Sequence, residues 1–449
     1  MMYDVIVIGS GLSGSVCALK CALSNLNVLV IEKLAHLGGT SSLSTLRMAV
    51  CGSKMQHKAN IIDNEDIFLQ DISKLTNGLN HINLTKKLVQ NSKYGLDFLL
   101  QNGCEFKNEI MWQDGHSVPR TLIPKNGALS ILSPLHNKLL NLKNCDILVQ
   151  HQVLDVKLDH DITITTIKNL KNGNIYEVKP NIAVVFATGG YARDKKFRTI
   201  QNPLTANIAS KASIGANADS LKILLGLNAT PILLSQMRYA FDFPLEIIKY
   251  SIIFSRKNTK RFLNENIQRQ ELGFKILTDM NAKSSELFPI AIFDANGIDN
   301  FDNPDILYDL TSKNILKKFE SLEQIALHYD INAQLLEKIV NIYNSDVKNG
   351  IDSEFSKQIN DYEIKPLSSP PFFAMEVAPL LNYTQGGVMV DDHARVLDTD
   401  QKNIANIYAI GEAVGGVHGE SRLISTSSTE CVVFGLIAAN DIINKKNMI

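Results

Sequence analysis

Residues 3–33 read YDVIVIGSGLSGSVCALKCALSNLNVLVIEK, which is a β-type run, a glycine turn, a helix-type run and a second β-type run. Gly9, Gly11 and Gly14 form the pattern GxGxxG directly after the first β-run. In this context the first glycine makes a tight turn, the second lets the backbone approach a pyrophosphate, and the third lets helix and strand pack closely. Glu32 ends the second β-run, where a carboxylate can hold ribose hydroxyls. The stretch therefore predicts an α/β fold that binds a dinucleotide.

The composition is that of an ordinary globular chain with a large core. Of its 449 residues, 45% are hydrophobic and 20% charged, and 45 basic against 46 acidic side chains give a net charge of -1. This balance predicts no nucleic-acid partner and no attraction to an anionic membrane. No uncharged apolar run reaches the roughly 18 residues that span a bilayer, so no integral membrane segment is expected.

The cysteines and the position of the first strand indicate the cellular compartment. Cysteines stand at positions 17, 21, 51, 104, 145 and 431, without a CxxC pair or a CxxCH haem motif. No metal site is expected. Because the first strand starts at Tyr3, it leaves no room for a signal peptide, and the sequence predicts a cytoplasmic protein with reduced thiols.

Three further glycine turns follow β-type runs: GGTSS (38–42), ATGG (187–190) and YAIGE (408–412). Glycine turns at several strand ends suggest one long ligand along the carboxyl edge of the sheet. The last turn opens GEAVGGVHGESRL (411–423), which combines backbone freedom with a glutamate, a histidine and an arginine.

This set of motifs resembles the flavoprotein family of fumarate reductases, succinate dehydrogenases, L-aspartate oxidases and 3-ketosteroid dehydrogenases. The resemblance covers essentially the whole chain, with ADSLKILLGLNAT (218–230), TQGGVMVD (384–391) and IYAIGEAVGGVHGESRL (407–423) as its clearest segments. It implies a doubly wound Rossmann-like FAD-binding domain (residues 1–234 and 372–449) with an inserted α+β capping domain (residues 235–371). The Pro-rich stretch KPLSSPPFF (365–373) is the best linker candidate.

The same resemblance implies FAD as the cofactor. Family members that bind FAD covalently use a histidine shortly after the GG turn, and no histidine lies between Leu37 and Gln56, so non-covalent FAD is expected. Glu412 is expected beside the ribityl chain, and the helix after Ser427 is expected to point its N-terminus at the flavin. The residues expected to bind FAD are Gly9, Gly11, Ser13, Gly14, Glu32, Lys33, Gly39, Thr40, Ser41, Val153, Ala187, Thr188, Gly189, Asp219, Gly387, Gly411, Glu412, Arg422 and Ser427.

The segment KRFLNENIQRQ (260–270) is similar to the family's RFxNExxxR, whose last arginine is the proton donor. The resemblance therefore implies that Arg269 is the proton donor. A guanidinium holds its proton at all accessible pH values, so it can serve only if a relay replaces the proton at once. In the family the relay is Glu-x-x-Arg about twenty residues upstream, where this chain has Glu246 and Lys249. The alternative for these two residues is a surface ion pair at i,i+3 spacing.

Arg422, in HGESRL, matches the arginine that clamps the substrate carboxylate in the family. The alternative is an arginine that binds a helix end or a surface acid. His418 is either a substrate contact or a residue that the loop backbone alone requires. The segment DGHSVPRT, with His116 and Arg120, resembles a loop that lies near the flavin in several family members. The alternative is that these two residues lie on the surface without a role in the site.

Two family histidines that bind substrate carboxylates have no counterpart here. Asn382 stands where one of them precedes the GG turn, and no histidine occurs between Asp161 and Leu327. Asn382 can donate a hydrogen bond but is neutral, and Arg238 is the candidate to replace the second histidine. The sequence therefore favours a small unsaturated acid other than fumarate.

The leading hypothesis is an FAD-dependent oxidoreductase that transfers a hydride between flavin N5 and the C=C (or CH–CH) of a small unsaturated acid, with Arg269 as proton donor. One alternative is an L-aspartate-oxidase-like enzyme, which RLISTSSTECVVFG (422–435) resembles. Another is a 3-ketosteroid-dehydrogenase-like desaturase with Tyr239 and Tyr383 at a carbonyl. The last is a non-catalytic flavoprotein subunit. The electron donor or acceptor is left open by the sequence.

Overall fold

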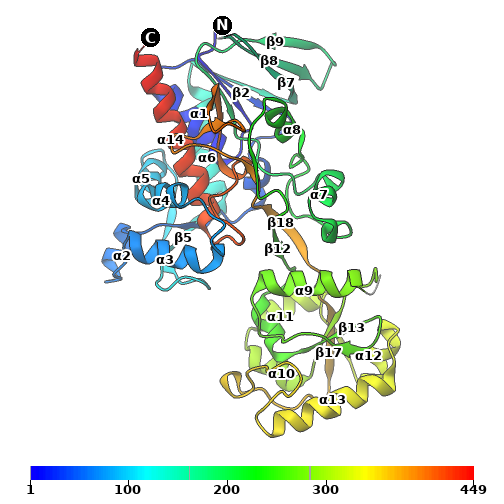
Figure 1. The fold of residues 1–449 in the computed structure, drawn as a ribbon. Coiled ribbons are helices and arrows are strands. Elements are labelled where there is room, and N and C mark those ends of the chain that lie inside the picture. Colours follow the sequence, from blue (N-terminus) through cyan, green and yellow to red (C-terminus); the bar gives the residue numbers. More distant parts are fainter. Residues whose placement is uncertain (1, 161, 283–284, 449) are drawn as a thin grey trace. The chain divides into compact units, whose positions relative to one another are not determined.

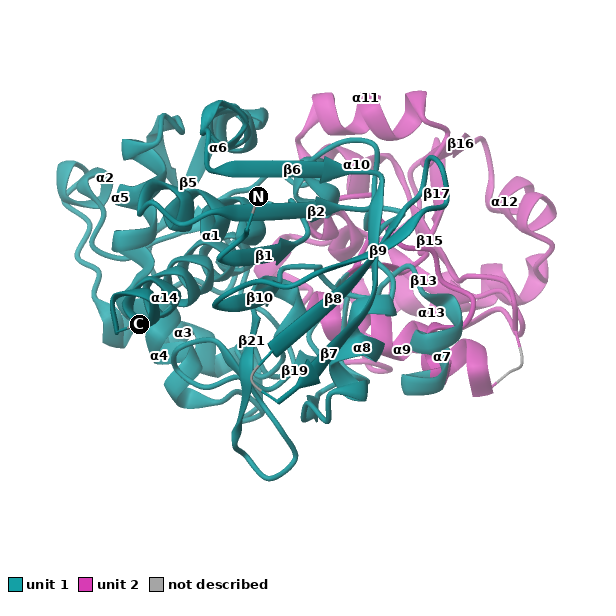
Figure 2. Cartoon of the chain, turned by 90° about the horizontal axis from the view of Figure 1, so that it is seen from above, with its two compact units in different colours: residues 1–202, 212–238, 383–449 teal, residues 203–211, 239–382 magenta. Residues whose placement is uncertain are grey.

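The structure is a computed structural model that describes residues 2–160, 162–282 and 285–448. The chain divides into two compact units, and Figure 2 colours them separately. Unit 1 comprises residues 1–202, 212–238 and 383–449, and unit 2 comprises residues 203–211 and 239–382. Residues 203–211 are a short first segment of unit 2; the chain enters it again inside β12 (Met237–Ala240) and returns to unit 1 inside β18 (Leu380–Thr384). The boundaries that we expected at 234/235 and 371/372 precede these two crossings.

A six-stranded sheet forms the centre of unit 1 (Figure 1). Its order is β20 (Arg395–Leu397), β21 (Asn403–Ala409), β10 (Ala183–Phe186), β1 (Val5–Ile8), β2 (Val28–Glu32) and β6 (Cys145–Val149). β1 pairs in parallel with both β2 and β10, so the chain builds the sheet outward from β1 first to one side and then to the other. β20 alone runs antiparallel to its neighbour. The predicted doubly wound α/β fold is confirmed.

Three of the four inner strands are almost wholly apolar because the sheet is covered on both faces. Every residue of β1, β2 and β10 is buried. Between β1 and β2 the chain forms α1 (Leu12–Leu23), which packs against α6 (Leu129–Asn141) and α14 (Thr426–Met448). The contact with α14 is close, since a Cβ on Gly435 would lie 2.9 Å from the carbonyl oxygen of Ser13.

The remaining elements of unit 1 surround this sheet. They include an antiparallel meander of β7 (His151–Asp159), β8 (Ile162–Asn169) and β9 (Ile175–Val178), which the alternation of the runs ITITTI and IYEV predicts. The other elements are η1 (Gly39–Leu43), β3 (Met48–Ala49), α2 (Lys54–Lys58), α3 (Glu65–Thr76), α4 (Ile82–Gln90), α5 (Ser92–Gln101), β4 (Phe106–Met111), β5 (Thr121–Ala128), α7 (Lys195–Gln201), α8 (Asp219–Gly226), β11 (Pro231–Ile232), β19 (Gly387–Val388) and η5 (Gly411–Ala413).

The amphipathic stretches of residues 46–144 predict a mostly helical segment, but one sheet of unit 1 lies within it. β5 lies between β3 and β4 in this sheet. β4 has no buried residue, so it lacks the alternation that marks a half-buried strand. β5 contains Pro124 and Gly127, two residues that argue against a strand. The expectation was wrong at these strands because neither carries a strand signal.

Unit 2 has its own antiparallel sheet with helices, as expected for an α+β domain. The strand order is β14 (Lys260–Arg261), β13 (Ile252–Ser255), β15 (Ile290–Phe293), β17 (Phe372–Glu376) and β16 (Lys317–Phe319). The helices are η2 (Pro203–Thr205), η3 (Leu245–Tyr250), α9 (Arg269–Ala282), α10 (Ala295–Phe301), α11 (Pro304–Ser312), α12 (Leu322–Tyr329), α13 (Ala333–Lys348) and η4 (Asn360–Tyr362).

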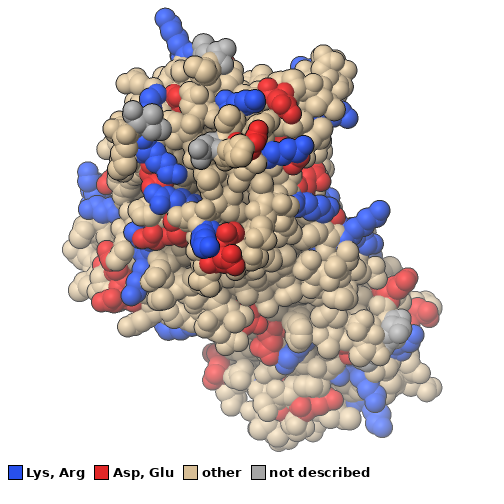
Figure 3. Space-filling model, turned by 45° about the horizontal axis from the view of Figure 1, so that its top comes forward, with Lys and Arg blue, Asp and Glu red and all other residues tan. Residues whose placement is uncertain are grey.

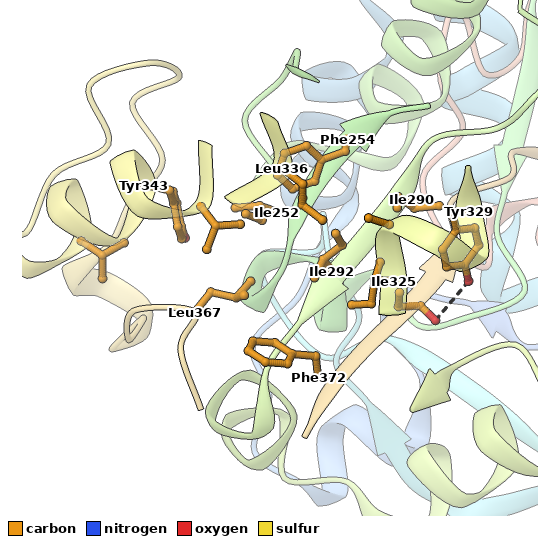
Figure 4. Packing of buried hydrophobic residues seen from close by; sticks show 14 of the residues in the cluster. Ile252, Phe254, Ile290, Ile292, Ile325, Tyr329, Leu336, Tyr343, Leu367 and Phe372 are labelled. Carbon is orange, nitrogen blue, oxygen red and sulfur yellow. Dashed lines mark hydrogen bonds between the residues drawn. The ribbon is translucent and has the colours of Figure 1, made fainter. Parts of the chain in front are cut away.

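The core of unit 2 forms where α12 and α13 pack on the sheet (Figure 4). Ile292 of β15 and Leu336 of α13 are fully buried there, and Leu367 from the Pro-rich stretch is part of the same cluster. The backbone N–H groups of Ser368 and Ser369 donate to the carboxylate of Asp294 at 3.0 and 2.9 Å. The stretch 365–373 is thus an integral part of unit 2, and its interpretation as a linker was wrong.

Unit 2 also contains four buried charged side chains, with exposures of 0 or 1%: Arg261, Glu265, Asp352 and Lys357. Arg261 donates to both carboxylates at 2.9–3.0 Å, and the Lys357 ammonium lies 3.3 Å from Glu265. Burial opposes the charge on Arg261, but Glu265 and Asp352 outweigh it and hold its pKa above the ordinary value. The cluster ties the segment 260–265 to the rest of unit 2, four residues before Arg269.

Replacing Glu265 with glutamine is expected to destabilise the protein by about 3 kcal/mol, because two buried cations then face one carboxylate. Urea unfolding measures the loss. Glu354→Gln is the matched control, since the Glu354 carboxylate is 52% exposed and lies 3.7 Å from the same guanidinium. It should cost less than about 1 kcal/mol. Equal losses in the two variants would contradict the assignment.

The surface carries both signs of charge side by side. On the face drawn in Figure 3, basic and acidic side chains are interspersed over the molecule. Among the described residues, no helix is long and apolar enough to cross a membrane. All six cysteines are free thiols, and five of them are buried.

Candidate active site

A pocket in unit 1 opens at the carboxyl edge of the central sheet. It contains about 890 Å³ of space between protein atoms, part of it open to solvent. Its walls come from the turns after β1, β2 and β10, from η1 and from the segment before α8. The expected cofactor residues that line it are Gly9, Gly11, Ser13, Glu32, Lys33, Gly39, Thr40, Ser41, Val153, Ala187, Thr188, Gly189, Asp219 and Glu412.

The glycines of the first turn are required by close backbone approach. Gly9 has φ +102°, and a Cβ there would lie 2.4 Å from the carbonyl oxygen of Ala187. A Cβ on Gly14 would lie 2.1 Å from the carbonyl oxygen of Gly9, so α1 can approach β1 only without a side chain. Gly11 precedes α1 and gives its N-terminus no side-chain cap. The N–H of Leu12 donates to the hydroxyl of Ser41 at 3.0 Å, and the rest of this helix N-terminus is suited to phosphate.

Glu32 is fixed at the end of β2. Its Oε2 accepts hydrogen bonds from the N–H and hydroxyl of Ser10 at 3.1 and 2.6 Å, and its Oε1 accepts from the N–H of Leu34 at 2.9 Å. A carboxylate offers about four acceptor positions, so one remains on Oε1 for a ribose hydroxyl.

A polar group lies further along the pocket. The Lys33 ammonium donates to the side chain of Asn217 at 2.7 Å and lies 3.9 Å from the Asp219 carboxylate. The Gln152 amide also donates to Asp219, at 3.1 Å. Burial lowers the pKa of Lys33, and Asp219 opposes that shift.

Glu412 lines the same pocket from η5. Its Oε1 accepts from the N–H and the hydroxyl of Thr384 at 2.8 and 3.1 Å. A Cβ on Gly190 would lie 2.3 Å from this oxygen, so the glycine makes room for the carboxylate. Burial raises the pKa of Glu412 to about 7, against the hydrogen bonds from Thr384.

The raised pKa predicts a pH-dependent stability. Between pH 4.5 and about 7 the folded protein keeps a proton on Glu412 that the unfolded chain has lost, so the free energy of unfolding falls as the pH rises through this range. Glu412→Gln removes this pH-dependent loss. Its free energy of unfolding should be roughly 3 kcal/mol higher than that of the wild type at pH 8, with little difference near pH 4.5. Urea unfolding at the two pH values measures it. Parallel pH profiles would contradict the assignment.

Five expected cofactor residues do not line the pocket. Gly14 and Gly387 allow backbone packing beside it, since a Cβ on Gly387 would lie 2.2 Å from the carbonyl oxygen of Ala413. Gly411 has φ +63° at the start of η5, and Ser427 is in the first turn of α14. Arg422 belongs to the cluster described next.

Arg422, His418, Tyr383 and Glu430 form a buried cluster in unit 1. The Tyr383 hydroxyl donates to Glu430 Oε2 at 2.7 Å, and His418 Nε2 lies 2.9 Å from the same oxygen. The Arg422 guanidinium lies 4.8 Å from the centre of the Tyr383 ring. Burial lowers the pKa of His418 and of Arg422, and it raises that of Tyr383.

Several polar atoms of this region lack a protein partner. Arg422 Nε, Glu430 Oε1 and both polar side-chain atoms of Gln385 are buried without a hydrogen bond among the described residues. Burying such groups unpaired is costly, so the set is suited to a polar ligand.

The four candidates Arg269, Glu246, Lys249 and Asn382 lie in unit 2, whereas Arg238 is in unit 1. Arg269 is the first residue of α9. Glu246 and Lys249 are in η3; Glu246 is exposed, and the Lys249 ammonium lies 4.4 Å from the centre of the Tyr362 ring. Within the described part of the chain these two residues form no ion pair with each other, which argues against the simple surface pair. Asn382 is in β18.

Sequence reasoning missed some of these residues. The pocket is also lined by Ser10, His151, Gln152, Ser213, Asn217 and Cys431. His151 and Gln152 follow β6, a parallel strand of the same sheet, so the strand-end rule could have found them. Glu430 was missed because a glutamate inside an apolar helix carries no local signal.

A family model described as an FAD binding domain matches residues 4–428. The chain belongs to this FAD binding domain family. The acrylate reductase flavoprotein subunit of Shewanella woodyi is 28% identical over 97% of this chain and 90% of its own length. Urocanate reductase of Eggerthella lenta is 27% identical over 97% of this chain and 73% of its own. The open conformation of a flavocytochrome c3 fumarate reductase matches with a TM-score of 0.85 at 25% identity, covering 99% of this chain and 78% of that one.

The pocket of this FAD binding domain protein fits FAD. The glycine turn and the uncapped start of α1 suit the pyrophosphate, the free acceptor of Glu32 suits a ribose, and the pocket continues to Glu412 and α14. The protein is an FAD-dependent oxidoreductase of the fumarate-reductase type.

Proposed function

We propose that this flavoprotein reduces the activated C=C bond of a small unsaturated acid, or carries out the reverse desaturation. The observation that carries the proposal is the buried Arg422 guanidinium, whose Nε lacks a partner among the described residues of the unit that holds the cofactor pocket. A buried guanidinium of this kind is suited to a carboxylate. The relatives named above include reductases of acrylate, urocanate and fumarate, three unsaturated acids.

Reduced FAD, when bound, supplies a hydride to the β-carbon of such an acid. The chain has three tasks: to bind the carboxylate, to stabilise the charge that develops on it, and to protonate the α-carbon. Arg422 binds the carboxylate and withdraws electron density from the double bond. Tyr383 and Glu430 hold the neighbourhood of Arg422 in place.

Arg269 gives the proton to the α-carbon. Its guanidinium must be reprotonated in each turnover. We assign this to Glu246 and Lys249, which share the short helix η3. Glu246 is exposed and can exchange protons with water, and the Lys249 ammonium is held over the Tyr362 ring of η4. These roles rest on the match to RFxNExxxR and on the absence of a pair between Glu246 and Lys249 in the described chain.

The favoured substrate is a monocarboxylic acid or an acid with one neutral arm. Asn382 contributes a neutral amide where the family has a histidine, and His418 is engaged by Glu430. A second carboxylate would therefore find fewer cationic groups than in fumarate reductases. Asn382 acts as a hydrogen-bond donor to the polar part of the substrate, whereas His418 donates its Nε2–H to Glu430 and presents Nδ1 as an acceptor.

FAD is held non-covalently, and the protein works in a reducing compartment such as the cytoplasm. No histidine stands between Leu37 and Gln56, and the six cysteines are unpaired. Acid precipitation should leave the flavin in the supernatant, whereas flavin in the pellet would show a covalent bond.

The test is steady-state turnover of the FAD-loaded protein with reduced methyl viologen under argon. Acrylate, urocanate and fumarate are offered at equal concentration, and L-aspartate is offered in air with a peroxide assay. The proposal expects oxidation of the viologen with at least one unsaturated acid and a lower kcat/KM for fumarate. Peroxide release with L-aspartate and no turnover of the acids would establish an oxidase instead.

A further inference from the structure

The loop between β4 and β5 touches the turn that carries Arg422. This loop, residues 112–120, contains Gly115 at φ +84°, where a Cβ would lie 2.9 Å from Leu423 Cδ1. His116 Nε2 lies 2.9 Å from the carbonyl oxygen of Ile424, two residues after Arg422. Both segments belong to unit 1, although more than 300 residues separate them in the sequence.

The two ring nitrogens of His116 have fixed roles. A carbonyl oxygen only accepts, so Nε2 carries the hydrogen that is donated to Ile424. His116 Nδ1 lies 3.5 Å from Arg120 Nη1, and a guanidinium only donates, so Nδ1 presents a lone pair. Burial lowers the pKa of His116, the bond to Ile424 raises it, and Arg120 lowers it further. His116 is therefore a neutral imidazole in one tautomer.

The Arg120 side chain is itself held rigidly by its neighbours. Its side chain is fully buried and donates to both oxygens of Asp63 at 2.9 and 3.0 Å and to Asp71 at 2.8 Å. The Phe68 ring lies against its other side, with the ring centre 4.4 Å from the guanidinium carbon. The ion cluster of Arg120 with Asp71 of α3 and with Asp63, which precedes α3, thus sets the position of the His116 ring.

The turn after Arg422 needs such support. Ser425 adopts φ +66°, a conformation that costs a residue other than glycine free energy and that persists only when surrounding contacts impose it. The contacts are the bond from His116 to Ile424 and a 2.5 Å bond from the Ser425 hydroxyl to Gln113 of the same loop. The N–H of Ala49 donates to the Ser425 carbonyl as well.

We propose that His116 is a positioning residue: it transmits the fixed geometry of the Asp63–Arg120–Asp71 cluster to the 422–426 turn and so directs the Arg422 guanidinium. His116 and Arg120 are buried, which excludes the surface alternative for these two residues, and both support this turn. The consequence for substrate binding rests on the proposed function, whereas the tautomer and the order of the turn do not.

The test compares His116→Phe with His116→Gln in the FAD-loaded protein. Phenylalanine keeps the ring but leaves the Ile424 carbonyl without its donor, while a glutamine amide can both donate to Ile424 and accept from Arg120. With acrylate as the probe, His116→Phe should raise KM about tenfold or more, the effect of one lost hydrogen bond, with a smaller fall in kcat because Arg422 also stabilises the developing charge. His116→Gln should restore KM to within about threefold of the wild type.

Equal KM values in all three proteins would overturn the proposal, as would a fall in kcat and FAD content without a change in KM. Nitrogen-15 NMR of the wild type covers the case in which the phenylalanine variant does not fold. His116 must show a protonated Nε2 and an unprotonated Nδ1 at pH 7, and the opposite tautomer or a cation overturns the proposal. If no acid is turned over, the proposed function fails, and faster amide exchange of residues 424–428 in His116→Phe still tests the positioning role.

Discussion

Replacing Arg269 with glutamine is expected to lower kcat for acid reduction by about 10²–10⁴-fold, the range for loss of a general acid. Glutamine keeps polar atoms near the same place but has no proton to give at neutral pH. Because the cofactor pocket is built entirely from unit 1 and Arg269 belongs to unit 2, FAD content should not change. The measurements are steady-state turnover with reduced methyl viologen and the flavin-to-protein ratio.

Lys275→Gln is the matched control for this variant. Lys275 lies in α9 six residues after Arg269 and pairs with Glu271 at 3.0 Å on the helix surface. Removing this exposed cation should change kcat by less than about twofold and stability by under 1 kcal/mol. A similar loss of turnover in both variants would show that the charge of α9, and not the Arg269 proton, supports the activity.

The Gly14→Ala variant should lose most of its FAD. The new Cβ would lie 2.1 Å from the carbonyl oxygen of Gly9, which is backbone and cannot turn away, so α1 must move back from β1. That displacement moves the helix N-terminus away from the pyrophosphate position. We expect FAD content below about a tenth of the wild type and a loss of about 3 kcal/mol or more in the free energy of unfolding.

Gly226→Ala provides the control for adding a methyl group to a helical glycine. Gly226 ends α8, and nothing lies within 4 Å of the position of its Cβ. Alanine should therefore keep FAD and stabilise the protein by up to about 1 kcal/mol. Flavin absorbance after gel filtration and urea unfolding measure both variants. Full FAD occupancy in Gly14→Ala would contradict the role given to the first turn.

The central sheet was predictable because its determinants are local. The strand, the glycine turn and the helix of residues 3–33 are adjacent in the sequence, and the spacing of Gly9, Gly11 and Gly14 identifies the turn. The turns at 38–42 and 187–190 meet the first turn because parallel strands share a carboxyl edge. For the same reason Glu32 could be placed from its position at the end of the second strand.

The surroundings of Arg422 were not predictable in this way. Glu430, Tyr383 and His116 reach that region from a helix, a strand and a loop that are far apart in the chain, and no spacing rule connects them. Glu430 is a charged residue inside the apolar run TECVVFG, which looks like a plain buried helix apart from that residue. His116 was noticed as part of a resemblance, but its role depends on a carbonyl 308 residues away.

The most direct test of the central claim is anaerobic stopped-flow reoxidation of the reduced flavin by acrylate, urocanate and fumarate, each added alone. We expect at least one of these acids to reoxidise the flavin within seconds, at a rate proportional to the acid concentration and with the saturated acid as product. Reoxidation by oxygen alone, with the flavin still reduced after minutes in the presence of all three acids, would contradict it.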